Sequence, residues 1–323
     1  QIGFLHYGIN TYYNQEWGHG NEDPSRIDPT GLDTDQWAKS FADGGFKMIM
    51  VTVKHHDGFE LYDSRYNTEH DWANTAVAKR TGEKDLFRKI VASAKKYGLK
   101  VGIYYSPADS YMEKKGVWGN NSARVERTIP TLVENDDRAD KVASGKLPTF
   151  KYKATDYGAY MLNQLYELLT EYGDISEVWF DGAQGNTAGT EHYDYGVFYE
   201  MIRRLQPQAI QANAAYDARW VGNEDGWARQ TEWSPQAAYN DGVDKVSLKP
   251  GQMAADGKLG SMSSVLSEIR SGAANQLHWY PAEVDAKNRP GWFYHASQSP
   301  ASVAEVVKYY EQSTGRNSQY LLN

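Results

Sequence analysis

Short apolar runs alternate with amphipathic segments along the chain. The strand-like runs cover residues 3–8, 46–53, 100–106, 177–181, 209–214, 228–233, 276–280 and 320–322. In most of the intervening segments apolar residues recur every three to four positions, a spacing typical of helices that pack one face on a sheet. These segments cover residues 33–43, 84–97, 156–172, 193–205, 264–270 and 302–314. Eight strands alternating with helices predict an α/β fold, a (β/α)8 TIM-like barrel.

Capping residues sharpen the helix boundaries. Asp33 is a predicted N-cap, and Ser302 followed by Glu305 forms a capping box. A doubly wound sheet is the alternative fold, but it usually carries a glycine-rich loop after its first strand. Residues 10–17 contain no glycine, which favours the barrel. The polar stretch 107–151 is predicted to be a long loop, of the kind that is usually functional or partly disordered.

The strand at 177–181 ends on a carboxylate. Side chains alternate along a strand, so Val178 and Phe180 point to one side and Trp179 and Asp181 to the other. Because barrel enzymes place their reactive groups at the C-terminal strand ends, Asp181 is a candidate for catalysis. The pair Asp-Gly is also a common turn, so its neighbours must decide.

The other strand ends carry histidines, carboxylates and aromatic residues. In chain order these are His6, His55, His56, Asp57, Tyr104, Tyr105, Glu224, Asp225, Glu232, Trp233, Glu283, Asp285 and Trp292. Glycoside cleavage needs two carboxyl groups, one that protonates the leaving oxygen and one that attacks or activates water. Asp181 is the natural nucleophile, and Glu224, Asp225 and Glu232 are candidates for the acid. A divalent metal held by His6, His55, His56, Asp57 and Asp181 is the rival interpretation.

Composition favours a carbohydrate substrate. The 323 residues include 24 Tyr and 10 Trp, and sugar rings stack on aromatic faces. The net charge of −8 argues against a nucleic-acid partner, which needs a basic patch. No apolar run approaches the ~18 residues of a membrane span. The absence of cysteine excludes disulfides and thiolate metal sites.

Four segments together resemble glycoside hydrolase family 29, the α-L-fucosidases. They are residues 4–8 (Phe-Leu-His-Tyr-Gly), 54–59 (Lys-His-His-Asp-Gly-Phe), 104–106 (Tyr-Tyr-Ser) and 179–182 (Trp-Phe-Asp-Gly). Residues 221–226, 231–234 and 289–295 resemble the second subfamily, which is selective for branched α-1,3 and α-1,4 fucosyl linkages. The family's C-terminal β-sandwich has no counterpart here, so we expect residues 1–323 to be a catalytic barrel truncated at both ends.

The resemblance implies a retaining exo-α-L-fucosidase without metal or cofactor. Asp181 matches the nucleophile and Glu224 the acid/base, while neutral histidines would donate to sugar hydroxyls. The residues that match or are assigned to substrate binding are His6, Glu16, Trp17, His55, His56, Tyr105, Trp179, Asp225, Trp233 and Trp292. The alternatives are a broad-specificity fucosidase and a fucose-binding barrel without turnover. A fucosylated oligosaccharide is the expected partner, and we expect a bacterial protein that is secreted, periplasmic or on the cell surface.

Overall fold

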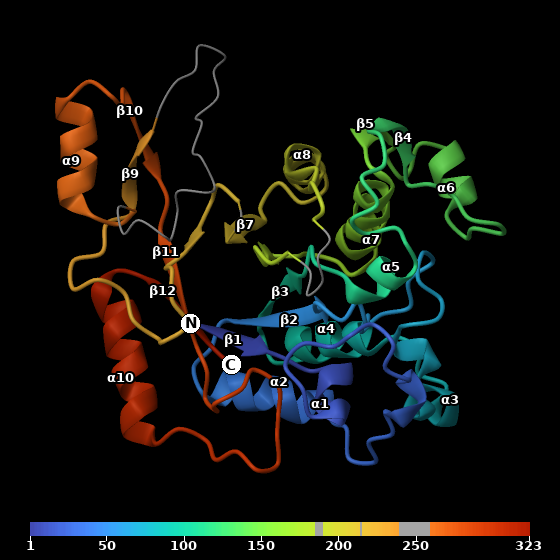
Figure 1. Ribbon diagram of the computed structural model, residues 1–323. Helices are drawn as coiled ribbons and strands as arrows, with labels where there is room; N and C mark the ends of the chain where they lie inside the picture. Colours follow the sequence, from blue (N-terminus) through green and yellow to red (C-terminus); the bar gives the residue numbers. More distant parts are fainter. Residues whose placement is uncertain (185–189, 214, 239–258) are drawn as a thin grey trace.

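The computed structural model describes residues 1–184, 190–213, 215–238 and 259–323 (Figure 1). Within these residues, eight parallel strands form one sheet in the order β7-β6-β3-β2-β1-β12-β11-β8. A single bridge between Ala212 and Ala218 joins β7 to β8 and brings the sheet close to full closure. The predicted (β/α)8-like barrel is therefore confirmed. Its strands are β1 (Ile2–Leu5), β2 (Met48–Lys54), β3 (Lys100–Tyr105), β6 (Glu177–Phe180), β7 (Ile210–Asn213), β8 (Arg219–Trp220), β11 (Ala282–Ala286) and β12 (Gln319–Leu322).

The longer helices begin where the capping residues predict. The side chain of Asp33 accepts from the backbone N–H groups of Asp35 and Gln36, and that of Ser302 accepts from Glu305. These contacts satisfy donors that the first helical turn leaves free. The α-helices are α1 (Ile9–Tyr13), α2 (Thr34–Asp43), α3 (Ala76–Thr81), α4 (Leu86–Lys96), α5 (Ser110–Lys114), α6 (Ala139–Ala143), α7 (Asp156–Glu171), α8 (Tyr195–Leu205), α9 (Met262–Arg270) and α10 (Val303–Ser313). Short 3-10 turns are η1 (Pro24–Arg26), η2 (Trp72–Asn74) and η4 (Thr314–Arg316).

The core has two layers, because each strand presents alternate residues to opposite sides. Val178 and Phe180 belong to the cluster between the sheet and the helices. Trp179 belongs to a smaller cluster inside the barrel, together with Phe4 and Tyr104. The two faces predicted for the strand at 177–181 are thus confirmed.

Two of the eight barrel strands lie elsewhere than predicted. Residues 228–233 form no strand, and the two-residue β8 takes that place by pairing with β11. Residues 276–280 do contain a strand, β10 (Gln276–Trp279), but it pairs antiparallel with β9 (Pro235–Ala238) outside the barrel. The seventh barrel strand is β11. Its inward-facing carboxylates make its sequence polar, so the hydrophobic pattern predicted a loop there. Ala214, in the predicted fifth strand, lies outside the described residues.

The polar stretch 107–151 is ordered rather than a bare loop. It contains α5, α6 and β4 (Val125–Ile129), and β4 pairs antiparallel with β5 (Phe150–Ala154) in a small sheet beside α7 (Figure 1). The long connection therefore forms its own layer over one side of the barrel. In the described part of the chain, no helix is long and apolar enough to cross a membrane.

Candidate active site

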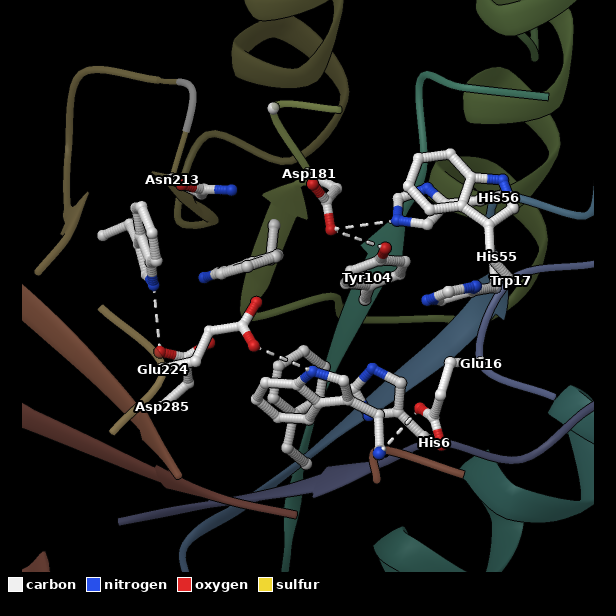
Figure 2. A pocket seen from close by; sticks show the side chains of 15 residues that line it. His6, Glu16, Trp17, His55, His56, Tyr104, Asp181, Asn213, Glu224 and Asp285 are labelled. Atoms are coloured by element: carbon white, nitrogen blue, oxygen red, sulfur yellow. Dashed lines mark hydrogen bonds and ion pairs between the residues drawn. The ribbon is translucent and has the colours of Figure 1, made fainter. Parts of the chain in front are cut away.

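A cavity of about 410 Å³ opens at the C-terminal ends of the barrel strands (Figure 2). This volume is in the usual range for a small-molecule site, about 300–1,000 Å³. The lining comes from the barrel strands and their ends and from the loops around residues 16, 224 and 292. The lining residues are Phe4, His6, Glu16, Trp17, His55, His56, Tyr104, Trp179, Asp181, Gly182, Asn213, Trp220, Glu224, Asp285 and Trp292.

Asp181 directly follows β6, and its carboxylate is held in place by neighbouring donors. The Tyr104 hydroxyl donates to Oδ2 at 2.8 Å, and the Ala183 backbone N–H donates to Oδ1 at 3.1 Å. His56 Nε2 lies 3.6 Å from Oδ2. The side chain is 28% exposed, so it is accessible to a ligand in the cavity. Asp181 is thus a fixed carboxylate with an open face.

Glu224 lies on the loop after β8, and its carboxylate points into the same space as that of Asp181 (Figure 2). Lys287 Nζ lies 3.1 Å from Glu224 Oε2, and Trp292 Nε1 donates to the same oxygen at 3.3 Å. The side chain is 50% exposed. The pocket thus contains a second carboxylate, fixed by a cation and an indole N–H.

The two other acid candidates from the sequence lie outside this pocket. Glu232 is buried and paired with the buried guanidinium of Arg219. Asp225 is exposed and lines a neighbouring cavity of about 500 Å³, which also touches Glu224 and Lys287. Of the three candidates, Glu224 is therefore the one that the fold brings to Asp181.

Three histidines line the pocket in neutral form, of which His55 and His56 are buried and His6 is half-buried. Burial lowers the pKa of His6 to about 3, and it also lowers the pKa of His55 and of His56. Desolvation is the main cause in each case, because burial disfavours the charged imidazolium. Neutral rings can hydrogen-bond sugar hydroxyls without adding charge to the site.

Aromatic rings form the apolar surfaces of the pocket. Trp17 stacks on His56 with ring centroids 4.0 Å apart, and Tyr104 stacks on Trp179 at 5.4 Å. Trp292 lies 5.0 Å from His6. Trp17 Nε1 and His55 Nδ1 are buried and have no hydrogen-bond partner among the described residues. A polar ligand would satisfy such groups, which are costly to leave unpaired.

Glu16 connects two loops at the pocket rim. Its Oε2 accepts from the backbone N–H groups of Trp292 at 2.8 Å and Phe293 at 3.3 Å. Its Oε1 lies 2.5 Å from His295 Nε2. Glu16 therefore lines the pocket and also anchors the loop that carries Trp292.

Three residues predicted to bind substrate are not in the pocket: Asp225, which lines the neighbouring cavity, Tyr105 and Trp233. Tyr105 faces the helices, where its hydroxyl donates to Gln164 at 2.5 Å, and Tyr104 takes its place in the site. The register shows why: Tyr104 is the partner of Trp179 on the adjacent strand, so the two share the inner face. Trp233 lies away from the pocket and donates its backbone N–H to Gly260.

Besides Tyr104 and Gly182, four pocket residues were not assigned to substrate binding from the sequence. Phe4 belongs to the inner face of β1, which alternation along that strand could have shown. Asn213 donates to the backbone oxygen of Phe180 at 2.5 Å, and Trp220 Nε1 donates to Asp285 at 2.9 Å. Both Trp220 and Asp285 belong to strands that the sequence pattern misplaced, which is why their inward direction was not evident.

Among the described residues, the side chains of the rival metal interpretation do not form a cluster of metal ligands. Asp57 turns away from the pocket and accepts from Asn10 Nδ2 at 2.9 Å and from the Phe59 N–H at 2.7 Å. Over residues 1–184, 190–213, 215–238 and 259–323, no group of three or more His, Cys, Asp or Glu side chains is arranged to hold a metal ion.

A barrel with an aromatic-lined pocket at its C-terminal strand ends, in which the partly exposed Asp181 and the exposed Glu224 present carboxylates beside Glu16 and Asp285, has the arrangement of a glycoside hydrolase. The family model for α-L-fucosidases matches residues 4–323, so the chain belongs to this family, glycoside hydrolase family 29.

Individual relatives agree with this assignment. The chain is 33% identical over 321 residues to alpha-L-fucosidase 1 of Arabidopsis thaliana, covering 99% of this chain and 52% of that protein. The crystal structure of a putative alpha-L-fucosidase from Bacteroides ovatus superimposes with a TM-score of 0.78 and 36% identity, covering 100% of this chain and 49% of that one. A family 29 fucosidase of Ruminococcus gnavus in complex with fucose superimposes with a TM-score of 0.72 and 27% identity, covering 100% of this chain and 60% of that one. The chain thus spans about half the length of its curated relative.

Proposed function

We propose that this chain carries the catalytic site of a retaining exo-α-L-fucosidase, with Asp181 as nucleophile and Glu224 as acid/base. One observation carries the proposal: the Asp181 and Glu224 carboxylates face the same pocket (Figure 2). Asp181 attacks the anomeric carbon while Glu224 gives its proton to the departing oxygen. Glu224 then takes a proton from the water that releases fucose.

The contacts of both carboxylates support these roles. The Tyr104 hydroxyl orients Asp181, and Lys287 together with Trp292 holds Glu224 Oε2. This leaves Glu224 Oε1 to reach the glycosidic oxygen. The floor is closed by Trp179, which is 5% exposed, so the pocket takes one terminal sugar rather than a chain passing through.

We further propose a preference for fucose in branched α-1,3 or α-1,4 linkage. The subfamily motifs in the sequence support this preference. The cavity of about 500 Å³ that adjoins Glu224 supports it too, because it offers room for an acceptor on the leaving-group side. Asp225 lines that cavity, and Trp292 stands at the pocket wall beside Glu224.

Turnover of an aryl α-L-fucoside by the Asp181→Ala and Glu224→Ala variants tests the mechanism. Asp181→Ala should abolish turnover, and azide should partly restore it by taking the place of the carboxylate. Glu224→Ala should largely spare the aryl fucoside, whose leaving group needs no acid, and should lose activity on a natural glycan. Equal losses on both substrates would assign the acid to another residue.

Stereochemistry is a separate test. Proton NMR of the first product should show α-L-fucose, and a ligand-bound structure should place the two carboxyls about 5–5.5 Å apart. β-L-Fucose as first product, or a separation of about 6.5–9.5 Å, would indicate inversion instead.

Comparison of an aryl fucoside with a Lewis-type branched trisaccharide tests the linkage preference. A poor aryl rate with a good trisaccharide rate supports it, whereas similar rates indicate broad specificity. Binding of fucose without turnover of either substrate would identify a fucose-binding barrel.

We also propose that the full-length protein acts outside the cytoplasm of a bacterium, where intact fucosylated glycans are met. Immunoblots of cell fractions from the native host test this location. Recovery in the cytoplasmic fraction alone would contradict it.

A further inference from the structure

The proton on His56 is placed by a residue behind the pocket, Ser106. Ser106 Oγ lies 2.8 Å from the backbone oxygen of Ala108. A carbonyl oxygen only accepts, so the single hydroxyl proton of Ser106 lies in that bond. His56 Nδ1 lies 2.6 Å from the same Oγ, and this short contact therefore needs its proton on Nδ1.

The opposite nitrogen of His56 is then a bare acceptor. Burial lowers the pKa of His56, so the ring holds one proton at neutral pH, and that proton is on Nδ1. Nε2 faces Asp181 Oδ2 at 3.6 Å, with no proton between the two atoms. The ring cannot turn away easily, because Trp17 stacks on its face. A sugar hydroxyl that contacts Nε2 must donate to it.

His6 shows the same arrangement independently. Its Nδ1 lies 2.6 Å from Asn323 Oδ1. That atom is an oxygen because it accepts the backbone N–H of His6, while Asn323 Nδ2 donates to the Trp292 carbonyl. His6 Nδ1 therefore donates, which leaves Nε2 without a proton. In both histidines this reverses the expectation that they donate to sugar hydroxyls.

We propose that Ser106 is a positioning residue that fixes the Nδ1–H tautomer of His56, so that Nε2 accepts a hydrogen bond from the 2-hydroxyl of the bound sugar. The proposal rests on the proposed function, since it places the anomeric carbon at Asp181. One neighbour of that carbon is the ring oxygen, which carries no proton. The other neighbour carries the 2-hydroxyl, whose hydrogen bonds strengthen in the transition state of glycoside cleavage.

Loss of the Ser106 hydroxyl frees the other tautomer. His56 Nε2–H would then donate to Asp181, which weakens the nucleophile and removes the acceptor for the 2-hydroxyl. We expect Ser106→Ala to lower kcat/KM by about 10- to 100-fold, the loss that follows removal of a group orienting a functional histidine in metal sites. Most of the loss should fall on kcat, because the contact is strongest in the transition state.

The matched control is Ser110→Ala. Ser110 is also buried and close in sequence, and its hydroxyl has no hydrogen-bond partner within the described residues. It should keep the wild-type rate. Ser106→Thr restores a hydroxyl and should recover much of the activity, which a purely steric role of Ser106 would not predict.

Nitrogen-15 NMR of histidine-labelled protein measures the tautomer directly, without substrate. We expect the His56 Nε2 signal to be of the unprotonated type in the wild type and to change in Ser106→Ala. A protonated Nε2 in the neutral wild-type ring would overturn the proposal whether or not the protein turns over fucosides.

The 2-hydroxyl is tested by a cycle of two sugars and two proteins. Calorimetry with L-fucose and 2-deoxy-L-fucose, and kinetics with the matching aryl glycosides, should show a large advantage of the 2-hydroxyl in the wild type and a small one in Ser106→Ala. An equal advantage in both proteins would overturn the assigned contact. If the wild type does not turn over the aryl glycosides but still binds L-fucose much more tightly than 2-deoxy-L-fucose, the proposed function is refuted while the contact between His56 and the 2-hydroxyl stays supported.

Discussion

A buried pair of carboxyl groups at the barrel floor makes Glu177→Gln an informative substitution. Glu177 lies on β6, two residues before Trp179, and faces Glu283 of β11. The Glu177 and Glu283 carboxyl groups are within hydrogen-bond reach of each other, so they can share a proton, and Glu177 has no other hydrogen-bond partner among the described residues. Burial raises its pKa well above the usual value, and the nearby Glu283 carboxylate raises it further. Glu177 therefore keeps its proton to a higher pH than an ordinary glutamate, and burial also raises the pKa of Glu283, to about 7.

The cost of that proton follows from linkage. In the unfolded chain Glu177 has a pKa of 4.5 and is ionised at pH 7, so folding must take up a proton. Each pH unit between 4.5 and the raised pKa of the folded state costs about 1.4 kcal/mol. The native state binds more protons, so this part of the stability is lost as pH rises above 4.5. A glutamine side chain at this position needs no proton and can donate its amide N–H to Glu283.

We therefore expect Glu177→Gln to raise the free energy of unfolding at pH 7, by about 1.4 kcal/mol for each pH unit by which folding raises the pKa of Glu177 within that range, and to change it little at pH 4.5. Urea denaturation at pH 4.5, 6 and 7 measures this difference. Glu134→Gln, an exposed site, should show no change at any pH. Activity on an aryl fucoside should remain, because the Trp179 contact to Glu283 is kept. A destabilised variant, or a gain that does not grow with pH, would refute the shared-proton interpretation.

Three further substitutions test single contacts in the site. Tyr104→Phe removes a hydrogen bond to the Asp181 carboxylate and should lower kcat/KM on an aryl fucoside about tenfold or more. Tyr105→Phe should keep the wild-type rate and lower the free energy of unfolding in urea by about 1 kcal/mol. The opposite order of effects on the rate would place Tyr105 in the site. Trp17→Phe keeps a ring against His56 but removes the unpaired indole N–H, so the KM for an aryl fucoside should rise. An unchanged KM would show that the indole N–H does not bind the sugar. Trp179→Phe leaves the buried Glu283 carboxyl group without its indole donor and should lower the free energy of unfolding, measured in urea, by about 1–3 kcal/mol. Wild-type stability of this variant would mean that water satisfies the Glu283 oxygen.

The sequence pattern located most of the barrel because strong apolar runs mark β2, β3 and β6, and Asp181 follows from the end of one such run. It missed β8 because two residues are too few to show alternation. It misread β11 because Glu283 and Asp285 occupy inward positions that are usually apolar. Strand prediction by hydrophobicity fails where the barrel interior is itself polar.

The site residues could be predicted only where the sequence shows which face of a strand a side chain occupies and which residues lie beside it. The choice between Tyr104 and Tyr105 depends on the register of β3 against β6, and a one-residue difference reverses the faces. The choice of Glu224 over Glu232 depends on the buried partner Arg219, which is 13 residues away in sequence. No local pattern reveals that Arg219 neutralises one carboxylate and leaves the other for the pocket.

The inner face of β6 places three groups in one column, because side chains two residues apart share a face. Glu177 lies at the floor, Trp179 above it, and Asp181 at the top. Trp179 donates to Glu283 at 3.0 Å and stacks on Tyr104, whose hydroxyl donates to Asp181. The nucleophile is thus linked through two rings to the buried acid pair. We infer that the polar floor, despite its cost in stability, holds the platform on which Asp181 is oriented.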